Sequence, residues 1–147
     1  MKKQIIKAKT FTPIYDEIED RIRLVINYKD PYNRIDLMIT RAFIIRLIPM
    51  LEEYLENNFN ISLESNKDIK KDINFTTKTD TDYIDFILKE ELLKEVNISL
   101  LEDKTNILMK FSSKSCEVNA LINSNILKEL VKNIKSAIPK FSWSLNI

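Results

Sequence analysis

Acidic side chains are the residues of this sequence best suited to chemistry, because the usual catalytic side chains are missing. The chain has no histidine, which excludes a Ser-His-Asp triad, a Cys-His pair and a histidine-liganded metal. It also has no glycine, which excludes a glycine-rich phosphate-binding loop and a dinucleotide-binding turn. A pair of carboxylates acting as acid and base, or a magnesium site made of carboxylates, stays open.

Two features of the sequence could carry such chemistry, an acidic cluster and the single cysteine. A metal site needs carboxylates that converge in space, and neighbours in the sequence do not ensure this. We therefore interpret the densest acidic cluster as a solvated turn before a strand; it consists of Asp16, Glu17, Glu19 and Asp20. We interpret Cys116 as a free thiol without a catalytic role, although the nearby Lys114 could activate it. The sequence thus predicts a protein that is not an enzyme and that holds no cofactor or metal.

Arginine is the residue type with the most uneven distribution. All five arginines fall between positions 21 and 46, whereas lysine is spread along the whole chain. The planar guanidinium group favours carboxylate and phosphate partners, which it binds through two parallel hydrogen bonds. We therefore select a candidate interaction surface that contains these arginines and one tyrosine of the same region: Arg21, Arg23, Arg34, Tyr32, Arg41 and Arg46.

Two interpretations of the arginines remain open at this point. A sheet face that exposes arginine and tyrosine is one way to bind single-stranded nucleic acid. Alternatively, the face pairs its own charges, with Arg23 diagonal to Asp36, or is covered by the other half of the chain. The net charge of +1 gives no support to a general affinity for polyanions, which favours the second interpretation.

Two strands joined by a short turn are predicted around the arginines. Residues 21–28 and 34–40 alternate between apolar and polar side chains, as half-buried strands do. A four-residue type I turn, with Pro31 at its second position, fits between them. One register places both apolar sets on the same face of the sheet; it pairs Ile26 with Ile35, Leu24 with Leu37 and Ile22 with Ile39.

The same alternation predicts a three-stranded antiparallel meander in the C-terminal part of the chain. Four-residue loops, 102–105 and 113–116, separate the alternating segments. The register that places all apolar residues on one face pairs the first strand with the second as Val96–Phe111, Ile98–Met109 and Leu100–Ile107. It pairs the second strand with the third as Phe111–Val118, Met109–Ala120 and Ile107–Ile122.

Helices are predicted after each group of strands. Apolar residues recur at spacings of three and four after Thr40, a suitable N-cap, and again after Ser124 until Pro139 ends the pattern. Pro49 should kink the first helix. A third, shorter helix is expected to follow a capping box at residues 79–82, with an apolar face made of Ile84, Ile87, Leu88 and Leu92. Alternating aromatic and aliphatic residues in 141–147 predict a last strand.

These elements predict an α+β fold, with antiparallel β-meanders and two long amphipathic helices packed on one face of a sheet. Shifting the chain by 83 positions aligns residues 34–55 with 117–138. This match indicates either an internal ββα/βββα duplication or only the general pattern of a strand followed by a helix. We predict one domain, 1–147, whose halves 1–56 and 79–147 are joined by a polar linker, 57–78.

The composition is typical of a globular protein, with 44% apolar and 31% charged residues. No apolar stretch approaches the roughly 20 residues of a membrane-spanning helix, and no export signal is recognised, so we expect a cytoplasmic protein. The function we predict is binding of another protein, as an adaptor, accessory or assembly factor, with a homodimer as an open possibility. Nucleic-acid binding through the arginine-rich hairpin is the alternative.

Overall fold

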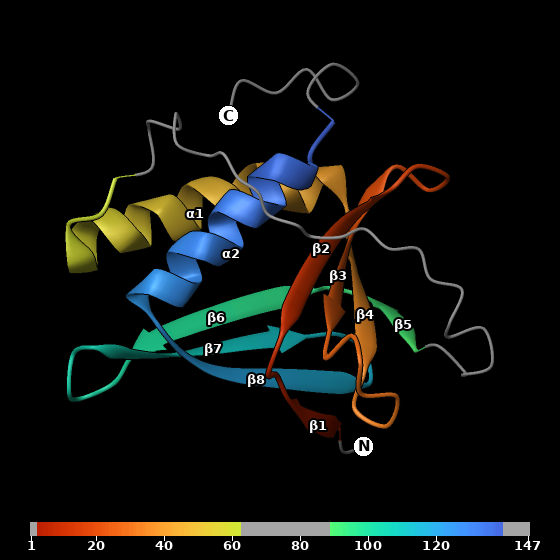
Figure 1. Cartoon of the computed structure of the whole chain (residues 1–147), viewed down its shortest axis with the longest axis horizontal. Helices are drawn as coiled ribbons and strands as arrows, with labels where there is room; N and C mark the ends of the chain where they lie inside the picture. Colours follow the sequence, from red (N-terminus) through yellow and green to blue (C-terminus); the bar gives the residue numbers. More distant parts are fainter. Residues whose placement is uncertain (1–2, 63–88, 140–147) are drawn as a thin grey trace.

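The described part of the chain, residues 3–62 and 89–139, contains eight strands and two helices in a computed structural model (Figure 1). In chain order these elements are β1 (Gln4–Lys7), β2 (Phe11–Asp16), β3 (Arg21–Ile26), β4 (Ile35–Ile39), α1 (Arg41–Phe59), β5 (Glu90–Leu92), β6 (Glu95–Leu100), β7 (Asn106–Ser112), β8 (Cys116–Asn123) and α2 (Ser124–Ala137). The α+β class predicted from the sequence is therefore confirmed.

The strands form two four-stranded sheets, which we call sheet A and sheet B. Sheet A has the order β1-β8-β7-β6, and sheet B has the order β2-β3-β4-β5. Three strands of each sheet are an antiparallel meander, whereas the fourth comes from a distant part of the chain and runs parallel: β1 beside β8, and β5 beside β4. The predicted antiparallel meanders are present, but both sheets are mixed, because a parallel strand pairs with the last strand of each meander.

The predicted registers of the β3–β4 hairpin and of the C-terminal meander are confirmed. Ile22 faces Ile39, Leu24 faces Leu37 and Ile26 faces Ile35 in the β3–β4 pair. The β6–β7 and β7–β8 pairs also have the expected partners. Alternation determines the register because a shift by one residue would turn every apolar side chain of the strand to the opposite face.

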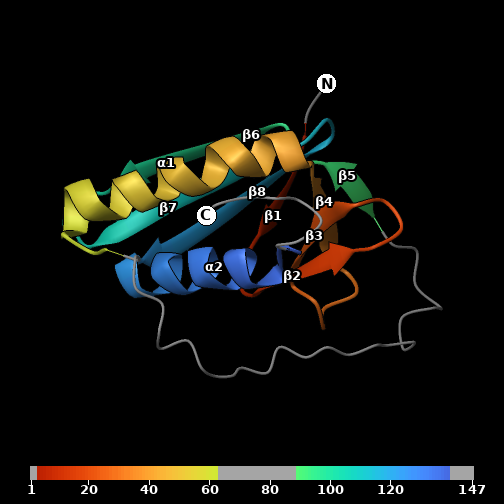
Figure 2. The ribbon, with the colours of Figure 1, turned by 90° about the horizontal axis from the view of Figure 1, so that it is seen from above.

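Both helices lie over the same face of sheet A, and sheet B stands at one end of this layer (Figures 1 and 2). Buried residues from both helices and both sheets form one apolar core. Thr40 caps α1 as predicted, since its hydroxyl accepts a hydrogen bond from the Phe43 amide, and the helix continues through Pro49. The prediction of two long helices was wrong: α1 has 19 residues, whereas α2 has only 14, Ser124–Ala137, with Asn123 as its N-cap.

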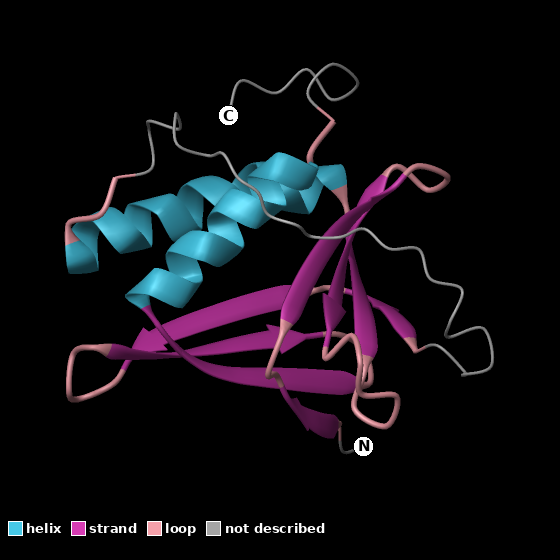
Figure 3. Ribbon diagram, viewed as in Figure 1, coloured by secondary structure: helices cyan, strands magenta, loops and turns pink. Residues whose placement is uncertain are grey.

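The third helix was also predicted wrongly where the structure describes it. Residues Glu90–Leu92 form β5, which pairs with β4 (Figure 3). Hydrogen bonds of this pairing satisfy the backbone of a segment too short to be a stable helix alone. The rest of that expected helix, the strand expected at 141–147 and most of the linker 57–78 lie outside the described residues; within them, α1 extends to Phe59.

An internal duplication is not supported. Three antiparallel strands followed by a helix occur twice, but the expected ββα unit has three strands and the two helices differ in length. Each sheet also incorporates a strand from the other part of the chain, so neither part forms a self-contained copy.

Turns without glycine rely on residues that tolerate the left-handed conformation. Asp20, Asn27 and Asn60 have φ angles of 58°, 57° and 60°, and Lys104 has a φ of 62°. Asn and Asp accept this conformation more easily than most other residues. Asn27 is buried, and its side chain accepts a 2.7 Å hydrogen bond from the Lys9 amide and donates to the carbonyl groups of Lys7 and Asn33. It thereby attaches the segment between β1 and β2 to the end of β3.

Candidate interaction sites

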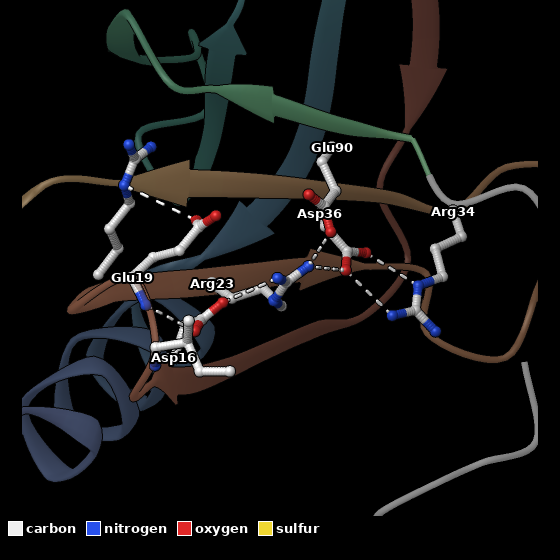
Figure 4. Close-up of polar contacts among 8 residues, drawn as sticks. Asp16, Glu19, Arg23, Arg34, Asp36 and Glu90 are labelled. Atoms are coloured by element: carbon white, nitrogen blue, oxygen red, sulfur yellow. Dashed lines mark hydrogen bonds and ion pairs between the residues drawn. The ribbon is translucent and has the colours of Figure 1, made fainter. Parts of the chain in front are cut away.

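A buried ion-pair cluster lies on the face of sheet B that carries the arginines (Figure 4). The Asp36 carboxylate has no exposed surface and accepts hydrogen bonds from two guanidinium groups. Arg34 binds it through two nitrogens, at 2.9 and 3.1 Å, and Arg23 binds it at 2.9 Å. The diagonal pair of Arg23 and Asp36 expected from the strand register is therefore present.

Arg23 connects three strands of sheet B. Its guanidinium group donates to Asp16 on β2, Asp36 on β4 and Glu90 on β5, at 2.9, 2.9 and 2.7 Å. Partial burial lowers the pKa of Arg23, but the hydrogen bonds to Glu90, Asp16 and Asp36 outweigh this effect and raise it. Burial likewise raises the pKa of Asp16, yet the bond from Arg23 and two backbone amides bring it below its ordinary value. The cluster thus holds its charges in fixed, paired positions.

The partners of Arg23 and Arg34 favour the interpretation that this face pairs its own charges. Arg34 also lies over the ring of Tyr28, at 4.7 Å from the ring centre. Three carboxylates do converge here, but on a guanidinium group, so their charge is already neutralised in part. Among the described residues, no group of three or more acidic or cysteine side chains is arranged to hold a metal ion.

The other candidate residues do not join this cluster. Arg21 is 3.9 Å from Glu19 at the β2–β3 turn, and Tyr32 is 88% exposed in the β3–β4 turn. Arg41 begins α1 and binds Asp20 at 3.0 Å, whereas Arg46 lies further along α1, over the ring of Phe43. The six residues selected from the sequence therefore belong to at least two different surfaces.

The acidic cluster and the cysteine have structural roles. Asp16 accepts hydrogen bonds from the amides of Ile18 and Glu19, which closes the turn before β3. Cys116 is buried at the start of β8. Beside it, the carboxylate of Glu91 accepts hydrogen bonds from the side chains of Ser113 and Ser115, and thereby joins β5 of sheet B to the β7–β8 turn of sheet A. Partial burial raises the pKa of Glu91, but these hydrogen bonds lower it below its ordinary value.

A small apolar pocket lies between α1 and β6, at the outer edge of sheet A. It has a volume of about 150 Å³ and is lined by Phe43, Arg46, Leu47, Met50 and Val96, which we call the α1–β6 surface. Met50 is 38% exposed there although it is apolar. Of the candidate residues from the sequence, Arg46 belongs to this surface. The other lining residues were missed, because helical spacing shows that one face of α1 is apolar but not which part of that face stays open.

Comparison with known proteins found no matching family model, no matching curated protein and no matching solved structure. Among the helices of the described residues, none is both long enough and apolar enough to cross a membrane.

Proposed function

We propose that this chain is a non-enzymatic cytoplasmic protein that binds other proteins, as an adaptor, accessory or assembly factor, and that the α1–β6 surface is its binding site. The observation that carries the proposal is an open apolar pocket next to an outer strand. Protein-binding sites combine such pockets for side chains with backbone groups or polar residues at their rim.

The size and lining of the pocket support a protein as the ligand. Small-molecule sites usually enclose about 300 to 1,000 Å³ and contain several polar groups that orient the ligand. The pocket here is about half the lower value and is lined by four apolar residues and Arg46. It can accept an apolar side chain, while Arg46 offers a cation at the rim. Methionine, as in Met50, adapts its shape to different partners.

Nucleic-acid binding through the arginine-rich hairpin is less well supported. It needs Arg23 and Arg34 to reach phosphates or bases, and both guanidinium groups already bind carboxylates of the same sheet. Replacing these partners by phosphate would leave the fully buried Asp36 without its cations.

The proposal predicts that Met50→Glu abolishes most partner binding. A carboxylate in the pocket must lose water when an apolar side chain enters, so captured partner should fall about tenfold or more. The measurement is quantitative affinity capture from the native host, with the tagged wild-type chain as reference. Leu121→Glu is the matched control, because Leu121 is 62% exposed on β8, facing away from the core.

The comparison of the two variants decides the proposal. Proteins retained by the wild type and by Leu121→Glu, but lost with Met50→Glu, support it. Equal retention by all three chains, or no retained protein with any of them, contradicts it. Circular dichroism spectra of the variants must match the wild type before the comparison is made.

A further inference from the structure

We propose that the partner of the α1–β6 surface is a second copy of this chain, and that two β6 strands pair antiparallel with Ile98 facing Ile98 of the other copy. This inference rests on the proposed function and names its partner. Pairing would join two copies of sheet A into one continuous sheet.

The first argument comes from the outer strands of the two sheets. An exposed outer strand tends to pair with another chain unless proline, lysine, shortness or a covering element prevents it. In the described sheets, β2 contains Pro13 and contacts α2, β5 has three residues, and β1 has four residues including Lys7. β6 has six residues and contains neither proline nor lysine. Among the residues that the structure describes, β6 therefore lacks the protection that the other outer strands have.

The backbone of β6 directs the amide and carbonyl groups of every second residue to the outer edge of sheet A. The amide of Leu101 donates to the carbonyl of Asn106, so this pair is hydrogen-bonded, and the antiparallel pattern alternates from there. Residues 95, 97 and 99 then bond to β7, whereas the amide and carbonyl groups of Val96, Ile98 and Leu100 point to the outer edge. Two copies can exchange hydrogen bonds only through these three residues.

One register of the β6–β6 pair brings side chains of similar character opposite each other. With Ile98 opposite Ile98, Val96 faces Leu100 of the second copy and exposed Asn97 faces exposed Ser99. Beyond the strand ends, the same register brings Lys94, just before β6, toward Glu102 in the β6–β7 turn of the second copy, and the two-fold axis repeats this approach at the other end. Both residues are exposed, which leaves them accessible to the second copy. At positions 96–100 the register therefore pairs apolar with apolar and polar with polar residues, whereas exposed Glu95 faces exposed Leu101 at the end of the strand.

The pocket supports the same arrangement. Val96 lines it together with Phe43 and Met50 of α1. Leu100 of the second copy would lie beside Val96, which lines the pocket, on the face that α1 covers. The pairing thus buries the apolar surface that the isolated chain leaves exposed.

The test is the mass of the full chain by light scattering and sedimentation, at low salt and up to about 1 mM. We expect twice the 17.4 kDa of one chain for the wild type. Lys94→Glu or Glu102→Lys alone brings like charges together twice in the dimer, so each should weaken dimerisation about tenfold. Lys94→Glu combined with Glu102→Lys should restore it. Lys29→Glu, the same charge change in the β3–β4 turn, should have no effect.

Amide hydrogen exchange provides a second measurement that needs no variant. In the dimer, the amides of Val96, Ile98 and Leu100 should become protected as the protein concentration rises, whereas those of Asn97 and Ser99 are protected throughout by β7.

The outcomes separate this inference from the proposed function. A dimer with restoration in the double charge variant and protection of Val96, Ile98 and Leu100 supports the inference. A monomer at every concentration overturns it. A dimer that is equally stable in the single and double charge variants and leaves these amides unprotected also overturns it. In either of the latter cases, loss of another protein from Met50→Glu would still uphold the proposed function.

Discussion

Asp36→Ala is expected to lower the free energy of unfolding by about 3 to 5 kcal/mol, because it removes one partner from a buried ion-pair cluster. The side chain of Arg34 is only 7% exposed and that of Arg23 is 19% exposed. Without Asp36, Arg34 loses its two hydrogen bonds to that carboxylate, whereas Arg23 keeps Asp16 and Glu90. Urea unfolding followed by circular dichroism measures the change.

The matched control for this variant is an ion pair on the surface. Arg41→Ala removes the pair of Arg41 with Asp20, whose side chains are 42% and 47% exposed. Exposed pairs contribute about 1 kcal/mol or less, so this variant should unfold nearly like the wild type. If Asp36→Ala cost no more than Arg41→Ala, the cluster would not stabilise sheet B as described.

Asn27→Ala is expected to lower the free energy of unfolding by about 3 kcal/mol or more, for two reasons that act together. The amide of Lys9 and the carbonyl groups of Lys7 and Asn33 would lose their partner in a partly buried place. Alanine would also have to adopt a φ of 57°, which costs about 1 to 2 kcal/mol. Loss of this side chain should release the segment between β1 and β2, which fixes β1 beside β8.

Two further variants separate these contributions. Asn27→Gly loses the same hydrogen bonds but tolerates the positive φ, so it should be more stable than Asn27→Ala by about 1 kcal/mol. Asn60→Ala changes a residue with a φ of 60° that is exposed after α1, and should cost only about 1 to 2 kcal/mol. If both Asn27→Ala and Asn60→Ala lowered the free energy of unfolding by the same amount, the hydrogen bonds of Asn27 would contribute nothing to stability.

The parts of the fold that could be predicted are those determined by neighbouring segments. Alternation of apolar residues fixed the registers of the β3–β4, β6–β7 and β7–β8 pairs, because each pair is joined by a short turn. Local signals also located Thr40 as the N-cap of α1. These features depend on interactions between residues close in the sequence, which a periodic pattern records directly.

The parallel strands could not be predicted, because their partners are far away in the sequence. Ile6 faces Val118 and Glu91 faces Leu37, and no local pattern records such a pairing. The alternation of β2 is also blurred, since Pro13 is buried while the apolar Ile14 is 39% exposed. Leu92 fitted a helical spacing, and its backbone pairing with β4 decided its conformation instead.

The candidate sites show the same limit. The contact of Arg23 with Asp36 followed from the strand register, whereas Glu90 joined them through the unforeseen β5. The α1–β6 surface depends on how α1 crosses sheet A, which places Met50 next to Val96. The spacing of Phe43 and Leu47 showed that one face of α1 is apolar, but not that part of it stays open at the edge of a sheet.

The central claim, that this chain binds protein through the α1–β6 surface, is tested most directly by site-specific photo-cross-linking in the native host. A photoreactive amino acid is placed at Met50 in the pocket, and at Leu121 on β8 as the control. We predict discrete protein adducts from position 50, with either a second copy or another protein, and none from position 121. Absence of adducts at position 50, or the same adducts at both positions, would contradict the claim.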